Sequence, residues 1–319
     1  MKKKLLFIYN PNAGRGKIKT KLSDVVEVFV KADYEVTIYP TKGKSDATRI
    51  VKNNAREYDL IVCSGGDGTL NEVTSGVMSL KTRPEVGYLP AGTTNDFAFS
   101  HKIPKNILNA AKVAAYGEPY YCDVGSINNE FFAYVAAFGA FTDVSYETPQ
   151  TAKNTMGRVA YILEGMKRLP SLKSYPMTVR YEDIIIEDEF LLGMITNTVS
   201  VGGFKGFKEN EILLDDGLYE VTLIKVPKNP IELQAIINTL ITKEVSTNLI
   251  YSFRTNQMTI EAKEQVPWTL DGEFGGNFSQ AEIKIYKQAI AYRTEGNKAL
   301  NSKKKEEVRA ALIDNKDKN

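Results

Sequence analysis

The strongest constraint on the fold is a regular alternation of apolar runs with segments of helical periodicity in the first third of the chain. Four apolar runs predict buried strands, at residues 4–9, 34–39, 60–63 and 86–89. Between them, apolar residues at helical spacing predict helices at about residues 22–29, 45–57 and 71–80. Such alternation is typical of the α/β class, a parallel sheet with helices on its faces. Ligands of these sheets bind in the crevice beyond the carboxyl ends of the strands.

Beyond about residue 120 the pattern becomes mostly strand-like. The predicted strands lie at residues 123–127, 131–138, 177–181, 184–186, 191–197, 219–226, 258–262 and 281–286, and helices interrupt them at 156–169 and 231–240. Consecutive strands of this kind predict a mostly antiparallel β-sandwich. Because 319 residues are enough for two domains, we place an α/β domain at residues 1–122 and the second domain at residues 123–293.

Composition and charge exclude several classes of protein. The chain has 41 Lys and Arg against 39 Asp and Glu, and its net charge of +2 is too close to zero for a nucleic-acid-binding protein. His101 is the only histidine, which argues against a histidine-based triad and an imidazole zinc site. Cys63 and Cys122 have no CxxC partner, as in a protein of the reducing cytoplasm. No apolar run is long enough for a membrane span or a signal peptide, so we expect a cytoplasmic protein.

A glycine-rich segment follows the third predicted strand. Residues 64–72 are Ser-Gly-Gly-Asp-Gly-Thr-Leu-Asn-Glu, and they lead into a predicted helix. Glycines let backbone amides approach a phosphate chain, and the start of the helix adds free N–H donors. Asp67 would repel phosphates unless a cation lay between them, so its presence indicates Mg²⁺. A tight glycine turn with a capping Asp is the alternative interpretation.

Two more loops of small and polar residues follow strands of the same predicted sheet. Residues 10–14, Asn-Pro-Asn-Ala-Gly, follow the first strand, and residues 90–96, Pro-Ala-Gly-Thr-Thr-Asn-Asp, follow the fourth. All three loops should therefore meet at one edge of the sheet. The chain has no GxxxxGK[ST], which excludes a P-loop kinase, and no complete GxGxxG after the first strand, which argues against dinucleotide binding.

Together, GGDGTLNEV, PAGTTNDFA, the early NPNAG and the late DGE resemble the bacterial diacylglycerol kinase family, in this order along nearly the whole chain. The wider group of lipid kinases with GGDGT includes sphingosine and ceramide kinases. The resemblance implies a nucleotide-binding α/β domain and a β-sandwich lipid-substrate domain, with the active site in the cleft between them. It also implies that the last residues, 294–319, return to the first domain.

The resemblance further implies roles for individual residues. ATP would contact Asn10, Pro11, Asn12, Ala13, Gly14, Thr41, Gly65, Gly66, Asp67, Gly68, Thr69, Leu70, Asn71 and Thr93. Asp67, Asp96 and Asp123 would organise the catalytic magnesium. Glu273 would be the general base. A second, structural magnesium would be held by the carboxylate of Asp216 with the backbone carbonyls of Leu213 and Leu218.

The chemistry of the reaction is consistent with a carboxylate at position 273. A lipid hydroxyl is a poor nucleophile at neutral pH, and a carboxylate beside it can accept its proton as the bond to phosphorus forms. Alternatively, Glu273 is an ordinary acid after a glycine turn, and Asp216 belongs to an Asp-Gly hairpin turn. Some relatives have Lys directly after the loop glycine. Here residues 14–17 are Gly-Arg-Gly-Lys, so either Arg15 or Lys17 could meet a phosphate.

We therefore predict a lipid kinase that uses ATP and Mg²⁺ to convert diacylglycerol to phosphatidic acid at the inner face of the membrane. Its membrane contact would be peripheral, through the Gly- and Phe-containing loop 202–207 or the Lys-rich segments 1–4 and 303–305, although each also fits ordinary core or solvated residues. Kinases for phosphatidylglycerol, sphingosine-like lipids, undecaprenol or NAD remain alternatives. A non-catalytic nucleotide- or lipid-binding regulator is another, which the intact set of acids disfavours. The sequence leaves a homodimer open.

Overall fold

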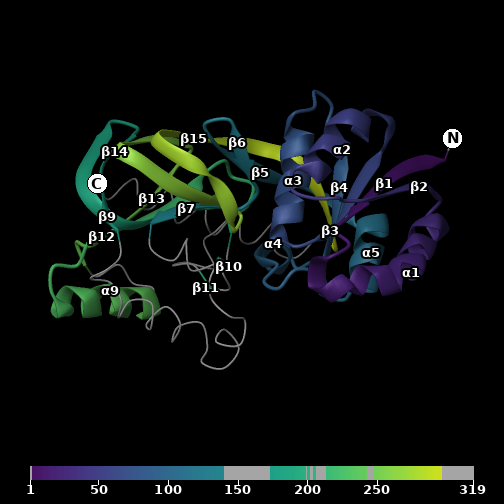
Figure 1. Cartoon of the computed structure of the whole chain (residues 1–319), viewed down its shortest axis with the longest axis horizontal. Coiled ribbons are helices and arrows are strands. Elements are labelled where there is room, and N and C mark those ends of the chain that lie inside the picture. The colour runs from purple at the N-terminus through teal and green to yellow at the C-terminus, as the bar shows by residue number, and fades with distance from the viewer. Residues whose placement is uncertain are drawn as a thin grey trace.

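The computed structural model describes residues 2–139, 173–198, 200–201, 204–205, 213–242 and 247–296. They form two lobes, one with helices around a sheet and one built mainly of strands, on the right and left of Figure 1. Several predicted features lie outside the described residues: the helix at 156–169, segment 303–305, most of the tail 294–319 and most of loop 202–207. In the described ranges, no helix is both long and apolar enough to cross a membrane.

The sheet of the first lobe contains the four strands that the apolar runs predict. They are β1 (Lys3–Tyr9), β2 (Tyr34–Pro40), β3 (Leu60–Gly65) and β4 (Glu85–Pro90), each within two residues of its predicted bounds. They pair in parallel in the order β2-β1-β3-β4. β3 is buried along its full length, which explains why its sequence is a continuous apolar run.

Helices cover this sheet. They are α1 (Lys17–Lys31), α2 (Asp46–Asn54), α3 (Asp67–Met78), α4 (Asp96–Ser100) and α5 (Ile107–Tyr116), with short 3₁₀ turns at Ala13–Gly16 and Ala55–Glu57. α2 packs against α3, and α1 packs against α5 (Figure 1). Helix α5 was not predicted, although Asn106 caps it by accepting hydrogen bonds from the amides of Leu108 and Asn109. α3 begins four residues before its predicted start, so Asp67 lies in its first turn.

The second lobe is built from antiparallel strands. They are β5 (Glu118–Ile127), β6 (Glu130–Phe132), β7 (Val135–Gly139), β8 (Tyr175–Tyr181), β9 (Ile184–Thr196), β12 (Tyr219–Lys225), β13 (Ile250–Thr255), β14 (Gln257–Leu270) and β15 (Glu273–Thr294). β7 and β8 each pair with both β9 and β14, which closes a ring of four strands. A short separate hairpin joins β10 (Ser200–Val201) to β11 (Phe204–Lys205), and α9 (Pro230–Thr242) packs beside the strands.

Strand bounds in this lobe differ from the predictions. The strands expected at 184–186 and 191–197 form one strand, β9, and the one expected at 131–138 is split at Ala133 and Tyr134 into β6 and β7. β13 was not predicted. Polar residues within β9 and β14 ended the predicted strands early, whereas cross-strand partners continue the real ones.

Two strands join the lobes. β5 begins five residues before Asp123, and β15 pairs with β14 and β5 before Tyr292 lies beside Val86 of β4. Figure 1 shows β15 as a yellow band that runs from one lobe into the other. The division of the chain at residue 123 stays a prediction.

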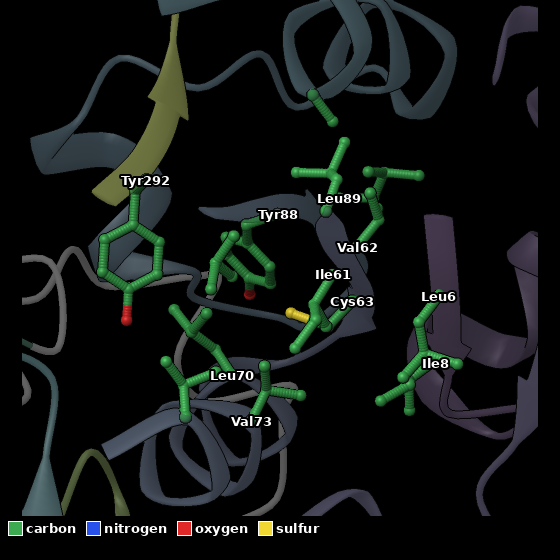
Figure 2. Close-up of a cluster of buried hydrophobic side chains, with 14 of the residues drawn as sticks. Leu6, Ile8, Ile61, Val62, Cys63, Leu70, Val73, Tyr88, Leu89 and Tyr292 are labelled. Atoms are coloured by element: carbon green, nitrogen blue, oxygen red, sulfur yellow. The ribbon is translucent and has the colours of Figure 1, made fainter. Parts of the chain in front are cut away.

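Each lobe has its own core. In the first, side chains of β1, β3, β4 and α3 pack together, and Tyr292 of β15 joins them (Figure 2). The core of the second lobe contains Trp268, packed edge-on against Phe138. His101 is buried against Phe97, with ring centroids 4.1 Å apart, and burial lowers its pKa to about 3. His101 and Trp268 are therefore packing residues.

Candidate active site

The loops that follow β1, β3 and β4 meet at the carboxyl ends of these strands. The amide of Asn10 donates to the carbonyl oxygen of Ser64 over 2.8 Å, and the amide of Ala91 donates to that of Gly65 over 2.7 Å. A Cβ atom added at Gly92 would lie 2.6 Å from Cα of Gly66, so only glycine lets these two loops come so close. The result is a surface lined by backbone, which suits a phosphate chain.

Asp67 and Asp96 begin α3 and α4 at this surface. Oδ2 of Asp67 accepts a hydrogen bond from the amide of Asn95 over 3.0 Å, whereas its Oδ1 is buried without a hydrogen-bond partner among the described residues. Burial raises the pKa of Asp67 to about 7, and the negative charges of Asp96 and Asp271 add to the effect. A cation beside Asp67 would give its Oδ1 a partner and would offset the repulsion between its carboxylate and those of Asp96 and Asp271.

This arrangement fits a magnesium ion. Mg²⁺ is usually bound by one or two carboxylates together with substrate phosphates and water. In the part of the chain that the structure describes, no group of three or more His, Cys, Asp or Glu side chains could enclose a metal by itself. Asp67 and Asp96 are therefore the residues that could share a magnesium ion with a bound nucleotide.

Glu273 lies directly against the glycine-rich loop, although it is 205 positions further along the chain than Gly68. A Cβ atom added at Gly68 would lie 2.9 Å from Cγ of Glu273 and 3.0 Å from its Oε1. Asp271 and Gly272 form the two-residue turn between β14 and β15, with φ of +50° and +87°, as a type I′ hairpin requires. The segment is thus a two-residue turn, and the turn carries Glu273 to the candidate site.

Several other predicted nucleotide contacts belong to the same loops. The backbone-lined surface is surrounded by residues 10–14, Gly65, Gly66 and Thr69. Thr93 is exposed on the loop after β4. The amide of Thr41 donates a hydrogen bond to the carbonyl oxygen of Tyr9. Two residues behave differently. Leu70 is fully buried in the core, so its side chain cannot meet a nucleotide. The side-chain amide of Asn71 donates to Asp271 and to the carbonyl oxygen of Phe131.

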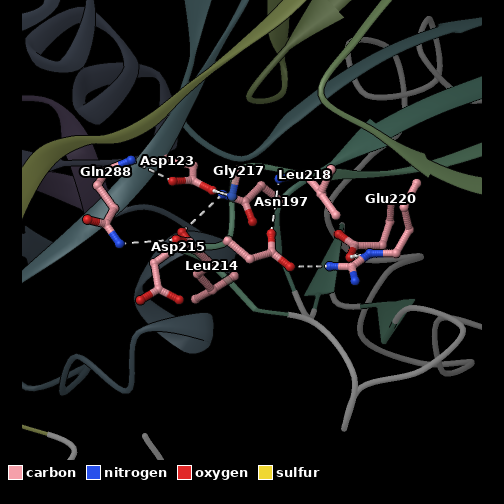
Figure 3. Close-up of polar contacts among 10 residues, drawn as sticks. Asp123, Asn197, Leu214, Asp215, Gly217, Leu218, Glu220 and Gln288 are labelled. Carbon is pink, nitrogen blue, oxygen red and sulfur yellow. Dashed lines mark hydrogen bonds and ion pairs between the residues drawn. The ribbon is translucent and has the colours of Figure 1, made fainter. Parts of the chain in front are cut away.

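Asp123 has its contacts elsewhere (Figure 3). It is buried, its Oδ2 accepts from the amide of Gly217 over 2.6 Å, and its Oδ1 accepts from the amide of Gln288 over 2.6 Å. Burial raises its pKa to about 6, and these two hydrogen bonds oppose the rise. Asp123 thus ties the turn at 214–217 to an irregular point of β15. A role for Asp123 at the catalytic magnesium stays a prediction.

The carboxylate of Asp216 is also engaged. Its Oδ1 accepts from the amide of Leu218 over 3.0 Å, and its Oδ2 lies 2.5 Å from Nη2 of Arg254. Arg254 reaches Glu220 as well, with 3.1 Å between Nε and Oε1. The structural magnesium that the resemblance implies, on Asp216 with the carbonyls of Leu213 and Leu218, stays a prediction.

A phosphate contact of Arg15 or Lys17 stays a prediction. Lys17 is exposed at the start of α1, and the side chain of Arg15 lies outside the described residues. The acid that sequence reasoning missed is Asp271, which is 2% exposed and hydrogen-bonded to three successive amides. Its only signal was its place in the DGE motif.

Comparison with known proteins gives a consistent result. Residues 4–127 match the family described as "Diacylglycerol kinase catalytic domain". The chain is 34% identical to a diacylglycerol kinase of Bacillus subtilis, covering 89% of this chain and 94% of the relative. It is 35% identical to one of Staphylococcus aureus, covering 89% and 92%. A crystal structure of a diacylglycerol kinase from Bacillus anthracis superposes with a TM-score of 0.71 at 26% identity, covering 92% of this chain and 97% of that one. This chain belongs to the diacylglycerol kinase family.

Proposed function

We propose that this protein transfers the γ-phosphoryl group of ATP to the hydroxyl of diacylglycerol and so forms phosphatidic acid. The observation that carries the proposal is the position of Glu273 against Gly68, because it brings a carboxylate beside a phosphate-type loop. The relatives named as diacylglycerol kinases support the choice of lipid. We place the active site in the cleft between the lobes, with the lipid reaching it from a membrane surface through a peripheral contact.

In this proposal each lobe has a separate task. The loops after β1, β3 and β4 bind the phosphate chain through backbone amides, and the N-terminus of α3 adds its partial positive charge. Asp67 and Asp96 would hold magnesium, which supplies charge neutralisation at the transferred group. Glu273 accepts the proton of the lipid hydroxyl as its oxygen bonds to the γ-phosphorus, while the bond from that phosphorus to the β–γ bridging oxygen breaks and ADP leaves. Phosphoryl transfer needs little more than such positioning and electrostatic stabilisation.

The decisive experiment follows labelled γ-phosphate from ATP into vesicle-borne lipids. Vesicles would contain diacylglycerol, phosphatidylglycerol, a sphingosine-like base or undecaprenol, each with magnesium and with excess EDTA. We expect label in phosphatidic acid only, and loss of the signal with EDTA and in Glu273→Gln. Label in another lipid with none in diacylglycerol, or undiminished transfer by Glu273→Gln, would refute the proposal. Cosedimentation with the same vesicles, and the mass of the protein in solution, would test peripheral binding at the inner face of the membrane and a homodimer.

A further inference from the structure

We infer that Asp271 and Asn71 form a link between the lobes that positions Glu273 over the first turn of α3. The inference rests on the proposed function, because it gives Glu273 the role of base. It assigns Asp271 and Asn71 as positioning residues, which act through Glu273 and do not touch the reacting atoms.

The first observation is how completely the carboxylate of Asp271 is held. Its Oδ2 accepts from the amide of Ala133 over 2.6 Å and from Nδ2 of Asn71 over 2.7 Å. Its Oδ1 accepts from the amides of Tyr134 and Val135 over 3.0 and 3.1 Å. The amide of Asp271 returns a hydrogen bond to the carbonyl oxygen of Val135 over 2.9 Å. An acid that accepts four hydrogen bonds in a buried place is anchored, and it is not available as a proton acceptor.

The second observation is that this anchor and the base share one hairpin tip. Asp271 and Glu273 flank Gly272, and both face α3, where Asn71 and Gly68 are three residues apart and so lie on neighbouring turns of one helix face. The tip therefore meets the helix at two points. One is a hydrogen bond between residues 200 positions apart, and the other is the packing of Glu273 on Gly68.

The third observation is that, among the residues that the structure describes, no hydrogen-bond or ion-pair partner holds the side chain of the base. The side chain of Glu273 is exposed, and in the described ranges no hydrogen bond or ion pair is found for it. Its place is set by the backbone of the hairpin turn. The turn has left-handed φ values at both central residues, which Asp-Gly pairs adopt readily in type I′ hairpins. The carboxylate bonds of Asp271 then fix this turn to Asn71 of α3 and to residues 133–135.

Asn71 contributes from the other side. Its Nδ2 donates both to Asp271 and to the carbonyl oxygen of Phe131, 3.0 Å away in β6. Both donor positions of the side-chain amide are thus directed at the second lobe. This use of Asn71 differs from the direct ATP contact that the sequence suggested.

The test measures kcat and the KM for ATP in Asp271→Asn and Asn71→Ala, with whichever lipid the wild-type enzyme phosphorylates. Asp271→Asn keeps the shape of the side chain but replaces an acceptor oxygen with a donor facing backbone amides. Asn71→Ala removes the link from the helix side and leaves the three amide bonds of Asp271 intact. We expect kcat to fall about 10- to 100-fold in both, since displacement of a base by about 1 Å costs up to this factor. The KM for ATP should change less than about threefold, because the phosphate loops are untouched.

Asp188→Asn is the matched control. Asp188 is also a carboxylate anchor of the second lobe, bound by Lys225 and by the hydroxyl of Tyr251, and it has no part in the proposed site. Its kcat should stay within about twofold of the wild type. The inference is overturned if folded Asn71→Ala keeps wild-type kcat, or if the KM for ATP rises as much as kcat falls. If Asp271→Asn does not fold, Asn71→Ala alone decides. Failure of the wild type to phosphorylate any lipid would instead count against the proposed function.

Discussion

The two lobes contribute different kinds of groups to the candidate site. The helix-covered lobe contributes backbone groups: its loops approach one another so closely that side chains are excluded at Gly14 and Gly92. The strand-rich lobe offers a side chain, Glu273, on a hairpin tip held by one buried acid. Backbone positions depend on short loops between neighbouring strands. The position of Glu273 depends on contacts of its hairpin tip with residues 136 to 200 positions away in the chain.

This difference has a physical origin. Parallel strands are buried on both faces, so apolar runs alone set their bounds. Antiparallel strands face water on one side, and their ends depend on which partner continues the ladder of hydrogen bonds. Local patterns therefore do not predict the bounds of long strands such as β9 and β14. In β14 the pairing is also irregular between Glu261 and Val266. In a site formed by both lobes, the residues on parallel strands are therefore predicted more accurately from the sequence than those on antiparallel strands.

The largest effect is expected for the contribution of the strand-rich lobe. Glu273→Gln should lower kcat about 10²- to 10⁴-fold, the range for loss of a general base, while the KM for ATP changes little. Steady-state kinetics with vesicle-borne diacylglycerol measure both constants. A comparable loss of ATP affinity would mean that the lobes do not divide the work in this way.

A smaller effect is expected for the backbone of the helix-covered lobe. Gly14 has φ of +56°, and a Cβ atom there would overlap the carbonyl oxygen of Ala91, so Gly14→Ala should distort the phosphate loops. We expect the KM for ATP to rise about tenfold or more and the stability to fall by about 1–3 kcal/mol. The matched control is Gly43→Ala, since a Cβ atom at Gly43 would meet nothing within 4 Å. Equal behaviour of the two variants in ATP binding and thermal unfolding would contradict the prediction.

The charge of Asp67 should appear in the pH dependence of stability. Its pKa in the folded state is raised from 3.8 to about 7, so between these values the folded state binds more protons than the unfolded state. Without magnesium, stability therefore falls as the pH rises from about 4 to about 7. Asp123 and Glu220 also have raised pKa values, so the comparison must be with Asp67→Asn, in which the part due to Asp67 disappears. We expect the two thermal midpoints to diverge by a few degrees across this range, in favour of the variant at pH 7. Thermal midpoints of the two proteins that differ by the same amount at every pH would rule out the raised pKa of Asp67.

The smallest effect is expected far from the phosphate loops. Arg254→Ala would leave Asp216 and Glu220 without their cation and should cost about 1 kcal/mol, because the pair is partly exposed. The KM for ATP should not change. Urea unfolding with and without magnesium checks this, with Lys21→Ala as the control for an exposed ion pair on α1. Unchanged stability of Arg254→Ala would show that Asp216 does not depend on the arginine.

How far the site could be foreseen varies from residue to residue. Asp67 was predicted because a glycine-rich turn before a helix is a local pattern, and the loop neighbours of β1 and β4 follow from parallel pairing. Asn71 was assigned to ATP because it belongs to the same motif, yet its side chain turns to Asp271. Asp271 gave no separate signal, since an Asp-Gly turn looks the same whether its carboxylate faces water or three buried amides.

The sequence by itself determined that phosphate-type loops follow successive buried strands, because hydrophobic period and glycine conformations are local properties of the chain. Only the tertiary structure decided which groups each acid contacts. It brought Glu273 onto Gly68, and it directed Asp123 and Asp216 to Gly217 and Arg254. The reason is that a carboxylate in the interior must find donors or a cation, and strand register, which no local pattern specifies, determines which ones lie within reach.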